Sequence, residues 1–213
     1  MKKLLIMATA IGMLASCNSG SDKTDTTDKQ SVAAPEGDIY TVDSTSAITW
    51  SASKPTATHT GTFNISEGKL YVKDNALTGG SFVINMASLN NVDLSNDPEN
   101  KGKLEGHLKS PDFFDIAKYP TSTFQITSVL PYSDSVNKEA THLVKGNLTL
   151  KDSTKNVSFP ARITVDAVTL SAAASFTIDR TEWGMNYKGP GNPQDWFITK
   201  NVNIKISVAA TKK

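Results

Sequence analysis

Few side chains in this sequence have a type and spacing that could support chemistry. The chain contains three histidines: His59, His107 and His142. They lie far apart and show none of the short spacings typical of metal ligands. Ser88 and Ser110 lack a convincing neighbouring base, and no Gly-x-Ser-x-Gly elbow is present. Asp112 and Asp115 form a pair of carboxylates beside a turn, where solvated surface charges are common. The sequence therefore predicts no catalytic site, no metal site and no cofactor, and it favours a binding protein over an enzyme.

The single cysteine, Cys17, lies where it would serve a membrane anchor. Lys2 and Lys3 are followed by an apolar run over residues 4–14 and then by small residues, which is the pattern of a secretory signal. The apolar run is too short to span a bilayer comfortably. Residues 14–17, Leu-Ala-Ser-Cys, resemble the lipobox of bacterial lipoproteins. The resemblance implies that residues 1–16 are removed and that the Cys17 thiol is acylated. The alternative is an ordinary signal in which the cysteine falls at this position by chance.

The charge balance argues against nucleic acid as a partner. The chain has 22 Lys+Arg and 21 Asp+Glu, a formal net charge of +1. Cleavage after residue 16 would remove Lys2 and Lys3 and no acid, which changes the balance to 20 against 21 and the net charge to −1. Binding to nucleic acid needs a concentrated basic surface that displaces counterions.

The composition changes between residues 18 and 37, which are rich in Ser, Thr, Asp, Lys and Gly and contain little apolar surface. Such a segment cannot bury enough surface to offset the entropy cost of ordering it. We expect residues 17–37 to comprise the acylated cysteine and a flexible tether, and residues 38–213 to form one folded domain.

Within that domain, apolar and polar residues alternate with a period of two. The clearest segments are residues 48–52, 81–86, 123–127, 156–165, 174–178 and 196–208. This period predicts strands with one apolar face. The sequence favours an antiparallel sheet, because parallel strands would need crossover helices and hardly any helical pattern lies between the strands. Leu104 and Leu108, four residues apart before Pro111, predict one short helix.

About eight such strands must hide their apolar faces, either against a second sheet or inside a closed barrel. We predict an all-β fold, an antiparallel closed or nearly closed barrel with one or two short helices. Closure removes exposed strand edges, and eight strands leave an interior that fills with side chains or holds one small ligand. The chain lacks the repeated aromatic girdles expected of a barrel that spans the outer membrane.

Several motifs resemble the YceI-like family of extracytoplasmic proteins. The matching segments, in chain order, are Ile48-Thr49-Trp50, His59-Thr60-Gly61-Thr62-Phe63, Leu77-Thr78-Gly79-Gly80-Ser81-Phe82, residues 107–124, Val144-Lys145-Gly146-Asn147-Leu148-Thr149-Leu150 and Asp179-Arg180-Thr181-Glu182-Trp183-Gly184-Met185. The resemblance implies a lipocalin-like barrel that binds a polyisoprenoid or another lipid chain.

We predict which side chains would contact that ligand. The candidates for an apolar cavity are Trp50, Phe63, Phe82, Ile84, Phe124, Phe159, Phe176, Ile178 and Trp183. His59, at the start of a strand near a barrel mouth, and Arg180 are candidates for binding a polar head group. For Arg180 the alternative is a structural latch of the barrel. Phe113 and Phe114 are interpreted mainly as packing that covers one barrel end.

The sequence thus predicts a binding protein that sequesters or carries a polyisoprenoid or other long-chain lipid and is attached to the membrane through Cys17. The expected location is the cell envelope, at the outer membrane, facing the periplasm or the cell surface. Two alternatives remain open: a structural or interaction protein whose barrel is filled by its own side chains, and a hydrolase or isomerase with an unrecognised site. The sequence leaves open whether the protein has a protein partner.

Overall fold

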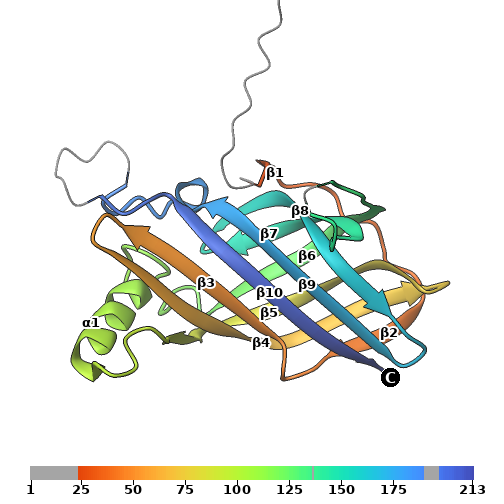
Figure 1. Ribbon diagram of the computed structural model, residues 1–213, viewed down its shortest axis with the longest axis horizontal. Helices are drawn as coiled ribbons and strands as arrows, with labels where there is room; N and C mark the ends of the chain where they lie inside the picture. The colour runs from red at the N-terminus through yellow and green to blue at the C-terminus, as the bar shows by residue number, and fades with distance from the viewer. Residues whose placement is uncertain (1–23, 136, 190–196) are drawn as a thin grey trace, which may run out of the picture.

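The computed structural model describes residues 24–135, 137–189 and 197–213, and within them the chain is mostly β-strand (Figure 1). The elements in chain order are β1 (Thr26–Asp28), β2 (Asp38–Val42), β3 (Ala47–Lys54), β4 (Ala57–Lys73), β5 (Ala76–Asn91), α1 (Pro98–Lys109), β6 (Thr121–Pro131), β7 (His142–Leu150), β8 (Ser153–Val165), β9 (Thr169–Asp179), the 3-10 helix η1 (Arg180–Trp183) and β10 (Asn201–Lys212).

The strands close into an antiparallel barrel with eight strand positions. Strands β4 to β10 follow one another around the wall, and β2 and β3 together occupy the eighth position between β4 and β10. The circle closes because β9 pairs with both β10 and β8. The predicted fold class is confirmed.

The alternation in the sequence sets which side chains point inward. On β5, Phe82, Ile84 and Met86 are buried in the barrel, and Phe124 on the neighbouring β6 stacks on Phe82 at 5.3 Å. Gly146 on β7 lies directly beneath the Phe124 ring, and a Cβ atom there would clash with it. The glycine of the Gly-x-Leu-Thr-Leu motif therefore makes room for an aromatic ring inside the barrel.

The predicted helix is confirmed as α1, which lies at one end of the barrel (Figure 1). Asp97 caps it, because its side chain accepts a hydrogen bond from the Asn100 N–H at 3.2 Å, and Pro98 occupies the first turn. The chain leaves the helix at Ser110 and turns back into β6. Among the described residues, no helix has the length and apolar character needed to cross a membrane.

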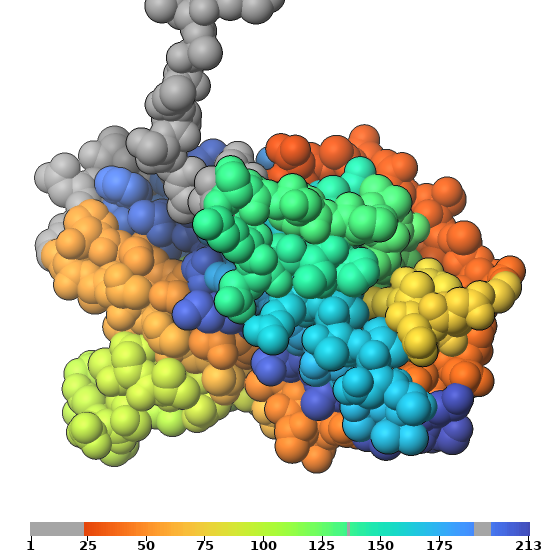
Figure 2. Space-filling model, turned by 45° about the vertical axis from the view of Figure 1, so that its right-hand side comes forward, coloured from red at the N-terminus to blue at the C-terminus, as the bar shows by residue number. Residues whose placement is uncertain are grey.

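Residues 24–37 differ from the tether that the composition predicts. We call them the N-terminal strap, because they run along the wall of the barrel instead of leaving it. The strap begins as β1 beside β8, and later Glu36 pairs with Lys73 on β4 at 2.7 Å. Figure 2 shows its red to orange atoms against the green strands of the outer surface. Polar and backbone contacts hold it there, which a pattern based on hydrophobicity does not reveal. Cys17 and the signal segment lie outside the described residues.

Candidate ligand-binding cavity

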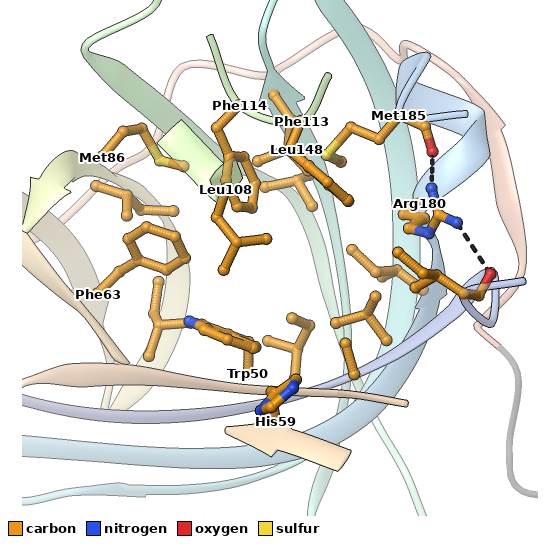
Figure 3. Close-up of a pocket in the computed structure, with 18 of the residues that line it drawn as sticks. Trp50, His59, Phe63, Met86, Leu108, Phe113, Phe114, Leu148, Arg180 and Met185 are labelled. Carbon is orange, nitrogen blue, oxygen red and sulfur yellow. Dashed lines mark hydrogen bonds between the residues drawn. The ribbon is translucent and has the colours of Figure 1, made fainter. Parts of the chain in front are cut away.

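The barrel contains a partly open cavity of about 340 Å³. Its lining includes residues of α1, which lies at one end of the barrel (Figure 1). Its wall is built from inward-facing side chains of the strands, and α1 and the turn after it close one side. Figure 3 shows Trp50, Phe63, Met86, Leu108 and Leu148 around this space. Its size falls within the usual range for small-molecule sites, about 300–1,000 Å³.

Most of the predicted apolar candidates lie on this wall. They are Trp50, Phe63, Phe82, Ile84, Phe124, Phe176 and Ile178. All seven face inward because they occupy alternate positions on strands β3, β4, β5, β6 and β9. Their contact with a ligand remains a prediction.

Phe159 and Trp183 do not line the main cavity. Phe159 stacks face to face on Phe176, with ring centroids 4.0 Å apart, and borders a separate space of about 50 Å³ deeper in the barrel. Trp183 is 1% exposed and donates from its indole nitrogen to the Leu148 carbonyl at 3.0 Å. Alternation along a strand predicts the inner face but not the depth, and Trp183 belongs to η1 rather than to a strand.

The turn after α1 contributes Phe113 and Phe114 to the cavity. The sequence predicts for them mainly a packing role that covers one end of the barrel. Phe114 lies edge-on to Phe63, with ring centroids 5.4 Å apart, and Phe113 lies beside the rings of His107 and Tyr187. Both phenylalanines, together with Leu108, line the cavity (Figure 3). These side chains thus cover one end of the barrel and also line the cavity. Met86, Met185 and Tyr187 also line the cavity and were not predicted.

The polar residues of the wall are mostly basic, and no Asp or Glu is among the described residues that line the cavity. The basic side chains are Lys54, His59, His107, Arg180 and Lys188. These five side chains differ in whether they already form an ion pair or hydrogen bonds with other residues of the protein.

The ring of His59 is held by Asp93, with 2.9 Å between Nδ1 and Oδ2. The other carboxylate oxygen accepts hydrogen bonds from the Thr60 N–H at 2.7 Å and the Asn91 amide at 2.6 Å. Burial acts to raise the pKa of Asp93, but these hydrogen bonds outweigh it and hold the pKa below its ordinary value. Asp93 therefore stays ionised and orients His59 on the wall. His107 pairs with Asp112 through its other ring nitrogen, with 2.9 Å between Nε2 and Oδ2.

Arg180 is buried, with 3% of the residue exposed. Its guanidinium is hydrogen-bonded to backbone carbonyls. It donates to the carbonyls of Met185, Tyr187, Ile198 and Thr199, two of these bonds being drawn in Figure 3. These bonds join the segment after η1 to the segment before β10. The geometry supports the latch interpretation of Arg180, because most of its donors are directed into the protein.

Lys54 and Lys188 are the two basic side chains of the wall with neither an acidic partner nor a hydrogen bond from the side chain among the described residues, whereas Arg180 is engaged by carbonyls. Lys54 ends β3 and is exposed at the rim, and the Lys188 Nζ lies 5.7 Å from the centroid of the Tyr187 ring. Both ammonium groups are thus able to bind an anionic group at the mouth.

The described residues offer little basis for other chemistry. No group of three His, Cys, Asp or Glu side chains in residues 24–135, 137–189 and 197–213 is arranged to hold a metal ion. The pair of His59 and Asp93 could orient a general base, but in the same residues no hydroxyl or thiol is hydrogen-bonded to the other ring nitrogen of His59.

Comparison with known proteins identifies relatives of this barrel. A family model described as the YceI-like domain matches residues 40–210. A UPF0312 protein of Pseudomonas aeruginosa is 38% identical over 64 residues, 30% of either chain. A UPF0312 protein of Vibrio cholerae is 33% identical over 97 residues, 46% of either chain. The chain thus spans less than half the length of the curated relatives that it matches.

Two solved structures share the fold. The BcnA protein of Burkholderia cenocepacia superposes with a TM-score of 0.62 at 20% identity, covering 80% of this chain and 99% of BcnA. A polyisoprenoid binding domain from Saccharophagus degradans superposes with a TM-score of 0.55 at 14% identity, covering 82% and 98%. At these identities the likeness concerns the fold. The family match covers the barrel from β2 to β10, and this chain belongs to the YceI-like family.

Proposed function

We propose that this protein binds the tail of a polyisoprenoid or another long-chain lipid inside its barrel and carries or sequesters it at a membrane. The observation that supports this most is the cavity of about 340 Å³, which has an apolar wall and is open at one end. An open interior favours a stored ligand over a barrel filled by its own side chains. The polyisoprenoid binding domain with the same fold is consistent with this ligand class.

The apolar wall can bind a tail without any pattern of hydrogen bonds. Burial of ten to twenty carbons would contribute roughly 8–16 kcal/mol, at about 0.8 kcal/mol for each CH₂. Immobilising the ligand removes a substantial part of this gain, and a site of micromolar affinity or better remains. The wall therefore selects for length and apolar character rather than for one particular chain.

The mouth adds a preference for an anionic head group. Lys54 and Lys188 have no carboxylate partner among the described residues, whereas Arg180 is occupied by carbonyls. We therefore assign the head group to these two lysines, with His59 nearby on the wall, and not to Arg180. A phosphate or carboxylate that reaches either ammonium group would form a charge-assisted hydrogen bond with it.

The membrane attachment is proposed from the sequence. The short apolar segment and Cys17 support acylation and a location in the cell envelope, with the barrel facing the periplasm or the cell surface. Cys17→Ser in the full chain should leave the precursor uncleaved and unlabelled by a radioactive fatty acid. Normal labelling of this variant would contradict the anchor and leave the barrel proposal intact.

Two matched ligands test the binding proposal. Geranylgeraniol and geranylgeranyl phosphate share a tail and differ in the head, and both should displace dansyl-undecanoic acid from the protein. The phosphate should bind more tightly, and the difference should shrink as salt is added, because screening weakens an exposed charge pair. Failure of both ligands to bind would contradict a lipid function, and equal binding would contradict the assigned head group.

A further inference from the structure

The wall of the barrel has a seam between β8 and β9. The ladder between these strands covers Ala161–Val165 of β8, paired with Leu170–Ala174 of β9. Toward the mouth the two strands separate, so residues 153–160 and 175–179 form no ladder with each other. A separated edge presents unpaired backbone N–H and C=O groups, which another strand can pair with.

The N-terminal strap fills this seam. Its β1 pairs antiparallel with Lys155–Val157 of β8. On the other side, the Thr24 N–H donates to the Thr177 carbonyl of β9 at 3.0 Å. Residues 24–28 thus lie between β8 and β9 as an added short strand, which is how extended peptides bind to open sheet edges.

A buried asparagine forms hydrogen bonds with the backbone of the strap beyond β1. The Asn147 amide accepts a hydrogen bond from the Gln30 N–H at 3.0 Å and donates to the Gln30 carbonyl at 2.8 Å. Asn147 is 2% exposed, and the Asn156 amide fixes its orientation by donating to its Oδ1 at 3.0 Å. Because both bonds go to main-chain atoms, this clamp recognises an extended backbone rather than a particular side chain.

The outer surface beneath the strap carries polar side chains, which water can hydrate when the strap is absent. The outward side chains that it covers are polar: Asn147, Asn156 and Thr177. The strap itself contributes little apolar surface, and the buried hydroxyl of Thr26 has no hydrogen-bond partner among the described residues. Departure of the strap would hydrate these polar groups and would also uncover Val157, which is 0% exposed and lies opposite Thr26 in the ladder.

We propose that the seam between β8 and β9, with its Asn147 clamp, is a binding site for an extended peptide strand. Residues 24–30 are its resident ligand, and the same segment of a second copy of this chain can replace them. Exchange of an identical element between copies is a low-cost route to association. The proposal is independent of any lipid in the cavity.

A disulfide experiment tests this exchange directly. Asp28 and Lys155 are opposite each other in the ladder and form an ion pair at 3.2 Å. Opposed residues of antiparallel strands have Cα atoms about 4.5–5.5 Å apart, within the range that a disulfide bridges. All variants are made in the full chain carrying Cys17→Ser, which removes its single native cysteine.

Asp28→Cys with Lys155→Cys in one chain should form an intramolecular disulfide. An equal mixture of the two single variants should form a cross-linked heterodimer. Its yield should exceed by about tenfold that of a control mixture of Asp28→Cys with Lys205→Cys, because exchange is specific and collision is not. Lys205 is exposed on β10, where it pairs with Ser175 on the side of β9 that faces away from the strap.

A synthetic peptide of residues 24–30 should suppress the heterodimer. The Gln30→Pro peptide lacks the N–H that donates a hydrogen bond to Asn147. It should therefore compete about fivefold less well, because one net hydrogen bond is lost. The Gln30→Ala peptide keeps that N–H and serves as the matched control. A mixture that cross-links no more than the control, a heterodimer that the peptide does not suppress, or a double variant without the disulfide would each overturn the proposal.

Discussion

Blocking the cavity with a single large side chain should weaken tail binding while leaving the barrel folded. Ala52 lies on β3, on the cavity wall, beside Val202 and His59 of the neighbouring strands. Ala52→Trp would place a bulky ring in the path between the mouth and the deep wall. Thr49→Trp is the matched control, because Thr49 lies on the opposite face of the same strand and outside the cavity lining.

The magnitude follows from the displaced volume. The change adds about nine heavy atoms, which at about 0.8 kcal/mol for each displaced CH₂ gives an upper limit of about 7 kcal/mol. The cavity is open at the mouth, so the tail can shift outward and keep most of its contacts. We expect a remaining loss of about 2 kcal/mol, which corresponds to about thirtyfold weaker binding.

The assay is a fluorescence titration with dansyl-undecanoic acid, with thermal unfolding measured in parallel. Ala52→Trp should weaken binding about thirtyfold, and Thr49→Trp should leave it within about twofold of the unmodified protein. A folded Ala52→Trp variant with unchanged affinity would refute the assignment of the cavity as the ligand site. Equal losses in both variants would refute the reasoning from displaced volume.

Three further predictions concern the polar groups. Lys54→Gln and Lys188→Gln should each weaken geranylgeranyl phosphate about threefold to tenfold in titrations at low salt and leave geranylgeraniol unchanged, because only the charged head meets these lysines; equal losses for both ligands would contradict this. Arg180→Met should lower the free energy of unfolding by about 2–4 kcal/mol in urea denaturation, since it leaves several carbonyls unpaired, and should not alter the preference for the phosphate; a selective loss of the phosphate would contradict the latch. Burial acts to raise the pKa of Asp179, but hydrogen bonds from Lys200 and Thr181 outweigh it and lower the pKa. A lowered folded-state pKa stabilises the protein above the unfolded value of about 3.9, and this contribution is lost as the pH falls through the folded value. The melting temperature of Asp179→Asn should therefore fall less than that of the unmodified protein between about pH 5 and about pH 2, and an equal fall would contradict the role of Asp179.

Much of the barrel could be predicted because its core follows a simple rule. Alternation identifies the inner face of each strand, so Phe82, Ile84 and Phe124 were placed inside correctly. The i and i+4 leucines before a proline were enough to locate α1. The depth of a side chain is not predictable from alternation, because it depends on the strand register, and Phe159 borders the smaller space instead of the main cavity.

The polar contacts could not be predicted, because they depend on distant parts of the chain. The sequence leaves Arg180 as either a head-group cation or a latch, because its carbonyl partners lie on segments that only folding brings together. The strap has the composition of a flexible tether, yet Asn147, 117 residues away along the chain, binds the backbone of Gln30. The composition of a segment indicates how much apolar surface it can bury. It does not indicate which backbone groups will form hydrogen bonds with distant side chains.

Native mass spectrometry of the protein gently extracted from its own cells is the most direct test of a barrel that holds a lipid. We predict that the folded protein carries one additional mass for each chain, and that denaturation releases it as a long-chain, water-insoluble molecule. Repeated spectra of an empty barrel, together with no uptake of dansyl-undecanoic acid by the same sample, would contradict the lipid-binding account.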